Sequence, residues 1–239
     1  MPTVTRLLYN NLVQFDSGTL SAHIISESNL IEEQDQLRIV LDRNEGRALG
    51  LAAAYWPTGQ LAMLAIADAS TIVIIDFKGN EHDERSFTLA DNAAARQFLT
   101  DNLLHRPTGF LYAFDIAPLS LALFQTLGLR ITNAIDMQCA GSPRTRAPLA
   151  TVKQAVGDLH RIYDENIKHI FSTDSDTITE YHHDKPPTKF TTPLALRAWI
   201  AHYLSQLAFM EDRLAQVPPV NTFRLSDIVS HSCFGEQHH

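Results

Sequence analysis

The sequence predicts an α/β fold: a mixed sheet of five strands flanked by helices. Two observations lead to this prediction. Three apolar runs of strand length follow one another near 47–54, 60–67 and 71–76, with only short turns between them. Further along, segments of strand character alternate with segments of helical character, which is typical of parallel strands joined by crossover helices.

The three apolar runs are expected to form an antiparallel meander. Trp56-Pro57-Thr58-Gly59 separates the first run from the second, and Asp68-Ala69 separates the second from the third. Before the meander, residues 20–25 have the pattern of a short strand. Asn29 is a candidate N-cap for a helix that extends to Val40.

After a polar loop at 78–86, the alternating pattern begins. Asp91 is the predicted N-cap of a helix over 91–104, which Pro107 terminates. A strand is expected at 109–114, a helix at 118–127 that stops at Gly128, and a fifth strand at 131–135. We expect these last two strands to run parallel to the first strand of the meander.

The remaining segments suggest more helices around one exposed stretch. Residues 148–171 have a helical pattern, and residues 172–192 are polar with two prolines, which favours an exposed loop. A long helix is predicted over 193–216, before Pro218-Pro219. We therefore divide the chain into an N-terminal extension (1–16), a main domain (17–217) and a C-terminal tail (218–239).

Composition and charge limit the function classes. The chain has 239 residues, of which 45% are hydrophobic and 19% charged, so it is expected to be globular. No segment has the length of a membrane span, and the two cysteines are far apart, which favours a reducing compartment, cytoplasm or nucleus. The net charge of −8 disfavours strong binding to nucleic-acid phosphates. Two groups of residues are candidate basic patches: Lys153, Arg161, Lys168 and His169, or Arg144 and Arg146.

The meander resembles the opening of the RNase D-type 3′–5′ exonuclease domains, which have the ribonuclease H-like fold. In that family the first strand ends in Asp-x-Glu, and both acids bind metal; here Ala52 and Ala54 occupy these positions. The resemblance covers roughly 17–215. It places Leu119 at the aspartate of the second motif and Asp136 at an aspartate that is usually structural. In the last motif it places Trp199 at the tyrosine and Tyr203 at the final aspartate.

The resemblance implies a fold without its usual chemistry. Cleavage by this family uses two hard metal ions held by several carboxylates, which Ala52, Ala54, Leu119 and Tyr203 do not provide. We therefore predict no metal, no cofactor and no catalysis, as in the degenerate family members that serve as scaffold or RNA-binding subunits. Without the resemblance, residues 52–54 would be a strand of small residues and Trp199 a core aromatic.

Two alternatives stay open at this stage. The first is a divergent active exonuclease with a rearranged metal site, for which the available acids are Asp68, Asp76, Asp115 and Asp136, with Asp115 and Asp136 as the leading substitutes. The second is a zinc-stabilised variant of the fold. Its candidate ligands are His182, His183, His231, Cys233, His238 and His239, although their spacing matches no standard zinc finger.

An inactive domain is expected to act through its surface. The expected partners are other proteins or a second copy of the chain, and any RNA is expected to bind weakly. Protein contacts need an apolar patch. The candidate residues lie at the two ends of the chain: Phe223, Leu225, Ile228, Val229 and Phe234 at the C-terminus, and Leu7, Leu8, Tyr9 and Leu12 at the N-terminus.

Overall fold

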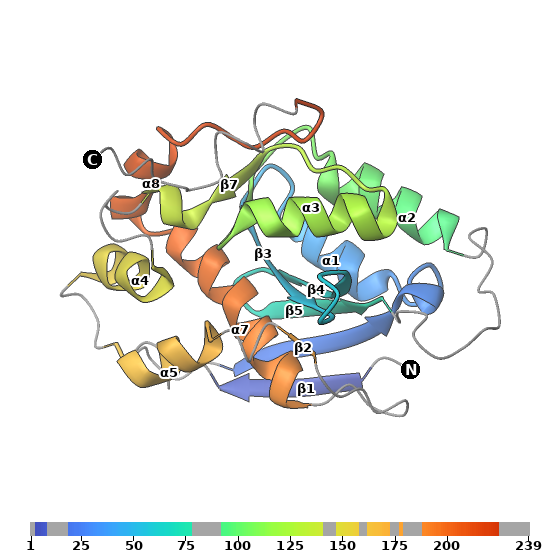
Figure 1. Cartoon of the computed structure of the whole chain (residues 1–239), viewed down its shortest axis with the longest axis horizontal. Coiled ribbons are helices and arrows are strands. Elements are labelled where there is room, and N and C mark those ends of the chain that lie inside the picture. The colour runs from blue at the N-terminus through green and yellow to red at the C-terminus, as the bar shows by residue number, and fades with distance from the viewer. Residues whose placement is uncertain are drawn as a thin grey trace.

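The computed structural model describes residues 3–8, 19–77, 92–140, 147–157, 162–172, 177–178 and 188–224. In this part of the chain, seven strands form one mixed sheet in the order β1-β2-β5-β4-β3-β6-β7 (Figure 1). The strands are β1 (Thr3–Leu8), β2 (Thr19–Ser26), β3 (Leu49–Tyr55), β4 (Leu61–Ala67), β5 (Thr71–Asp76), β6 (Leu111–Ala113) and β7 (Ala134–Asp136).

The pairing confirms the predicted meander. β4 pairs antiparallel with both β3 and β5, while β6 is parallel to β3 and β7 is parallel to β6. Five strands were predicted for the sheet and it has seven, because β2 joins it parallel to β5 and β1 pairs antiparallel with β2. β1 lies within the segment expected as an extension.

Helices cover both faces of the sheet. The α-helices are α1 (Asp35–Arg43), α2 (Ala93–Leu99), α3 (Ile116–Leu127), α4 (Pro148–Val156), α5 (Asp164–Ile170), α7 (Thr188–Ser205) and α8 (Ala208–Leu214). Figure 1 shows α4, α5 and α8 gathered around α7, with α1, α2 and α3 on the other side of the sheet.

The meander strands are apolar on both faces because helices bury both. Along β3, Ala52 and Ala54 pack in the core under α7, whereas Leu51 and Ala53 pack in the core formed by α1, α2 and α3. Alternate side chains of a strand point to opposite faces, so a strand between two helical layers needs apolar residues throughout. For this reason these strands are continuous apolar runs in the sequence.

Several predicted helices have different boundaries. Asn29 does not cap a helix: it ends a 3₁₀ turn (Glu27–Asn29), which is followed by the fully buried Leu30, and α1 begins only at Asp35. The helix predicted from 91 begins at Ala93, after Asn92, and continues into a π-helical segment (Thr100–Leu104). The proposed cap Asp91 lies outside the described residues.

The two longest helical predictions each cover two helices. Within 148–171, α4 ends at Val156, before Gly157, and α5 follows. Gly157 has a positive φ of 57°, which glycine adopts readily. Within 193–216, α7 begins earlier, at Thr188, and ends at Ser205, before α8. The Ser205 hydroxyl donates to the carbonyl of His202 (2.6 Å), a local bond that competes with continuation of the helix.

Two segments expected at the surface are tied to the sheet. Ile178, within the predicted exposed loop 172–192, is fully buried, and its N–H donates to the carbonyl of Tyr55 at the end of β3 (2.9 Å). Val220, within the predicted tail, forms an antiparallel bridge with Ala134 of β7. Both contacts join segments that are remote in sequence, so local patterning does not predict them.

Candidate functional site at the carboxyl end of β3

Ala52 and Ala54, which the resemblance aligns with metal-binding acids, lie toward the carboxyl end of β3. Because β2, β3, β5, β6 and β7 run in the same direction, their carboxyl ends meet at one edge of the sheet. Ala52 and Ala54 lie on one face of β3 near this edge and are 7% and 0% exposed. The structure therefore places the methyl groups of Ala52 and Ala54, which the resemblance aligns with Asp-x-Glu, on one face of the strand.

Helix α7 lies very close to that face of β3. A Cβ atom built on Gly50 would fall 1.9 Å from the carbonyl oxygen of Ala198 and 2.6 Å from the nitrogen of His202. Such a contact requires a glycine in the strand, and both Ala198 and Ala201 on the helix are fully buried. The small side chains of β3 and α7 thus form a closely packed interface where carboxylates would stand in the family pattern.

A buried arginine approaches the same end of the strand. Arg197 of α7 is 7% exposed, and its Nη2 donates to the carbonyl of Ala53 (3.0 Å). Burial lowers the pKa of Arg197 to about 10, an effect opposed by Tyr55 and by the carboxylate of Asp115. The guanidinium therefore stays protonated at neutral pH, and a fixed positive charge sits beside β3.

The charge of Arg197 acts on the buried phenol of Tyr55. Burial raises the pKa of the Tyr55 phenol, the nearby Arg197 lowers it, and Asp115 raises it again. Asp115 precedes α3 as its N-cap residue, with a left-handed backbone (φ 57°), and its Oδ1 accepts a hydrogen bond from Gln138 Nε2 (2.5 Å). Asp115 lies at the carboxyl edge, with Gln138 as the partner of its side chain.

Asp136 contacts backbone amides through both carboxylate oxygens. Its Oδ2 accepts from the N–H of Ile116 (3.2 Å) and its Oδ1 from the N–H of Gln138 (2.8 Å), while only 4% of the residue is exposed. These bonds join the end of β7 to the start of α3. This arrangement agrees with the structural role that the resemblance implies for this aspartate.

The other two candidate acids lie at opposite edges of the sheet. Asp76 ends β5, which β4 separates from β3, so it shares the carboxyl edge with Asp115 and Asp136. Asp68 lies in the turn between β4 and β5 at the other edge. Its Oδ1 accepts from the N–H groups of Ser70 and Thr71, and its Oδ2 from Asn44. Asp68 is therefore a turn-forming residue remote from the other three.

Of the other three degenerate positions, Trp199 belongs to the same core as Ala52 and Ala54, and Tyr203 packs against that core. Leu119 packs in the core on the opposite face of the sheet. Trp199 Nε1 donates to the carbonyl of Ala69 in the β4–β5 turn (3.4 Å), and the ring of Tyr203 stacks on Trp199 with centroids 5.4 Å apart. Burial raises the pKa of Tyr203 to about 12, so it is a neutral phenol.

Sequence reasoning missed Arg197. The signal available was a single arginine in the apolar segment Leu194–Ile200, two residues before Trp199, on a helix expected to cover the sheet. A charged residue in such a position is unusual unless it has a partner in the core.

The residues at this site do not fit the divalent metal ions that the resemblance would require. Ala52 and Ala54 offer no anionic oxygen, and the guanidinium of Arg197 would repel a divalent cation beside them. Over the described part of the chain, no group of three or more His, Cys, Asp or Glu side chains has a metal-binding arrangement. None of the helices described there is long and apolar enough to cross a membrane.

Comparison with known proteins supports the fold. No protein-family model and no curated protein matches the sequence. Among solved structures, the catalytic core of RRP6 from Trypanosoma brucei, in a mutant form, matches with a TM-score of 0.50 and 17% identity over 87% of this chain. The chain has an exonuclease-type fold. It spans about half (51%) of that RRP6 core.

Two further exonuclease domains match less closely. The EXD2 exonuclease domain soaked in Mn and GMP has 15% identity and a TM-score of 0.35, over 82% of this chain and 93% of that one. The EXO domain of Aedes aegypti Nibbler has 12% identity and a TM-score of 0.36, over 82% and 87%.

Proposed function

We propose that this chain is a catalytically inactive 3′–5′ exonuclease-like domain that acts as a protein-interaction module. The observation that carries the proposal is the buried guanidinium of Arg197 beside Ala52 and Ala54. Metal-assisted phosphodiester cleavage needs carboxylates that gather two divalent cations. Here the corresponding place holds methyl groups and a fixed positive charge, which favours a structural role for this region.

Access to the end of β3 also supports inactivity. The N–H of Ile178 bonds to Tyr55, and its side chain is fully buried in the same core as Ala52 and Ala54. A segment that pairs with the last residue of β3 occupies space at the mouth of the strand. A nucleic-acid end would have to displace Ile178 to approach the strand there.

One observation favours the alternative of an active enzyme with a rearranged site. Asp76, Asp115 and Asp136 all lie at the carboxyl edge of the sheet. Asp136, however, already accepts two backbone N–H bonds and Asp115 accepts a side-chain bond. Binding a metal there would require breaking contacts that hold α3 to β7, so we rank this function second.

A nuclease assay separates the two functions. Protein purified free of other nucleases is incubated with single-stranded RNA and DNA in Mg²⁺ or Mn²⁺. We expect no shortening from the 3′ end. Cleavage that follows the protein through purification and is lost in Asp115→Asn would overturn the proposal and establish the rearranged site.

The interaction surface that we propose includes Phe223, which is 57% exposed. Beside it on α3 lies Phe124, which is 48% exposed, and the guanidinium of Arg130 lies 4.8 Å from the Phe124 ring centroid and 5.3 Å from that of Phe223. We call Leu121, Phe124, Arg130 and Phe223 the α3 patch. Exposed aromatic side chains next to an arginine are typical of protein contact surfaces.

The other predicted interaction residues at the C-terminus, Leu225, Ile228, Val229 and Phe234, lie outside the described residues, as do Tyr9 and Leu12. Leu7 and Leu8 belong to β1. The partner we propose is a protein or a second copy of the chain. RNA is the weaker candidate, because Lys153 pairs with Asp164 (2.5 Å) and Lys168 with Glu165 (2.6 Å), which neutralises much of the basic patch.

The α3 patch can be tested with a matched control. The double variant Phe124→Ser and Phe223→Ser removes its two exposed aromatics, and Phe209→Ser removes a 48% exposed phenylalanine that contacts Arg213 on α8. If the partner is a second copy of the chain, we expect the double variant to lose self-association, measured by light scattering. If the partner is another protein, we expect the double variant to lose the proteins that co-purify with the chain from native cells. Phe209→Ser should keep both. Equal loss in the two variants would show that the α3 patch is not the interface.

A further inference from the structure

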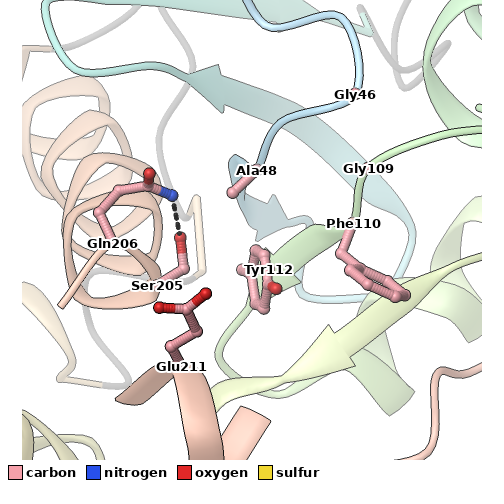
Figure 2. A pocket seen from close by; sticks show the side chains of 8 residues that line it. All are labelled: Gly46, Ala48, Gly109, Phe110, Tyr112, Ser205, Gln206 and Glu211. Carbon is pink, nitrogen blue, oxygen red and sulfur yellow. Dashed lines mark hydrogen bonds between the residues drawn. The ribbon is translucent and has the colours of Figure 1, made fainter. Parts of the chain in front are cut away.

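A polar cavity lies at the opposite edge of the sheet from the degenerate site. It has a volume of about 250 Å³ and is formed where the loops before β3 and β6 meet the end of α7 and the start of α8. Figure 2 shows its eight labelled residues, with the carboxylate of Glu211 directed toward the space beside Tyr112. No part of the proposed function uses this cavity.

Two glycines help to shape the cavity. Gly46 and Gly109 both have positive φ angles (71° and 76°), which glycine adopts without strain. A Cβ on Gly109 would fall 2.4 Å from the carbonyl oxygen of Arg47, so only glycine lets the two loops approach this closely. The loops bring Phe110 and Tyr112 to one wall, with ring centroids 6.2 Å apart in an edge-to-face arrangement.

Three polar side chains of the cavity offer hydrogen-bond acceptors. Gln206 Nε2 donates to Ser205 Oγ (3.1 Å), which leaves the Gln206 amide oxygen as an acceptor. The Ser205 hydroxyl donates to the carbonyl of His202, so Ser205 offers the cavity an oxygen and no proton. The carboxylate of Glu211 accepts only.

The cavity also has a negative charge. Glu211 is the only charged residue among the eight described lining residues. Burial raises the pKa of Tyr112, and the carboxylate of Glu211 raises it further, so the negative potential of Glu211 extends to the aromatic wall. In the described part of the chain, no Lys or Arg forms an ion pair with Glu211.

From these features we propose that the cavity binds a single organic cation, an alkylammonium or guanidinium group. Such a group donates several hydrogen bonds, pairs with a carboxylate and interacts favourably with aromatic rings, which matches the three kinds of group present. The volume lies below the roughly 300 Å³ at which drug-sized ligand pockets begin, so the site suits a side chain or a small amine. The same chemistry comes from a free amine or from a lysine or arginine of a protein.

The test follows the backbone amides of Gly46, Gly109 and Gln206 by NMR in isotope-labelled full-length protein. The probes are butylammonium and its uncharged analogue butan-1-ol. We expect saturable shifts with butylammonium, weakened by salt, and none that saturate with butan-1-ol. Equal responses to the two probes would overturn the proposal, because they would show that charge is not recognised.

Matched variants test the role of Glu211. Glu211→Gln keeps the shape and removes the charge, and we expect it to weaken butylammonium binding by about threefold, because Glu211 is exposed and solvent screens its charge. Asp212→Asn removes an exposed charge from the next position of α8, outside the cavity, and should bind like the original protein. Thermal unfolding verifies that both variants are folded. Unchanged affinity in Glu211→Gln would overturn the proposal.

The source of the cation is distinguished with peptides. Gly-Lys-Gly is compared with butylammonium and with Gly-norleucine-Gly, in which the lysine charge is absent. Tighter binding of Gly-Lys-Gly assigns the cavity to a protein side chain, and binding of butylammonium alone assigns it to free amines. Guanosine is the competing ligand: saturable binding of guanosine without any binding of the cations would replace our proposal by a nucleobase site. None of these outcomes depends on the nuclease assay.

Discussion

Single residues at the α7–β3 interface show how burial changes proton binding. His202 of α7 is 6% exposed, and its Nδ1 lies 3.2 Å from the carbonyl oxygen of Ala48. Burial lowers the pKa of His202 from 6.5, while the bond to Ala48 and the charge of Asp68 oppose this shift. The neutral imidazole is therefore the form that the folded protein prefers.

This preference predicts a pH dependence of stability. The unfolded chain binds a proton at His202 at a higher pH than the folded chain does, so the stabilising contribution is complete above pH 6.5. As the pH falls below 6.5, stability is lost by at most about 1.4 kcal/mol per pH unit for this one group, until the folded pKa is reached.

The measurement is the free energy of unfolding in denaturant between pH 8 and pH 5.5. His202→Gln should show a shallower decrease than the original protein, because glutamine does not titrate. The pKa of His23 is also lowered by burial and should account for part of the remaining slope. An identical slope in both proteins would refute the role of His202.

At the scale of elements, the backbone of α7 lies unusually close to that of β3. Gly50 allows the contact, and the buried Ala198 and Ala201 provide the small surface on the helix. Arg197 bonds to the backbone of the same strand, which fixes the helix along β3. Close backbone approach of this kind needs residues with little or no side chain.

Gly50→Ala should therefore destabilise the protein by about 3 kcal/mol or more, because the added methyl group meets backbone atoms of α7 that cannot turn away. Gly59→Ala is the control: nothing lies within 4 Å of its added Cβ, and its φ of 82° should cost only about 1 kcal/mol. Denaturant unfolding measures both. Equal costs would contradict the close contact between α7 and β3.

At the scale of the whole molecule, the chain beyond α8 returns to the sheet. Thr222 is 2% exposed; its Oγ1 accepts from the N–H of Ile131 (2.9 Å) and donates to the carbonyl of Ile131 (3.2 Å). Arg130 Nη1 donates to the carbonyl of Thr222 (2.6 Å), and Val220 pairs with Ala134. These contacts hold residues 130–134, which lead into β7 and include Arg130 of the α3 patch.

Two truncations test this role. Ending the chain after Val217 removes the partners of the backbone groups of Ile131 and Ala134, which are buried. Each buried group left unpaired costs about 1–3 kcal/mol, so we expect a loss of about 3 kcal/mol or more. Ending it after Arg224 keeps all of these contacts and should leave the free energy of unfolding nearly unchanged. If both truncated proteins were equally stable, residues 218–224 would have no structural role.

The sequence by itself determined the strands of the meander, the α3 helix up to Gly128 and the direction of β6 and β7 relative to β3. It also identified Ala52 and Ala54, whose i, i+2 spacing fixes their common face whatever the rest of the fold does. Apolar periodicity, glycine stops and turn residues are local signals, so they can be recognised in one segment without its neighbours.

Only the tertiary structure decided what surrounds those alanines. Arg197 lies 144 residues from Ala53 in sequence, and Ile178 reaches Tyr55 from a segment whose polar composition predicted an exposed loop. The resemblance assigns Leu119 to the aspartate of the second motif, and on α3 this residue packs in the core on the other face of the sheet. Two remote segments meet at residues that are set by the rotation of the helix and by backbone contacts such as that at Gly50. The pattern of a single segment encodes neither the rotation nor the contact.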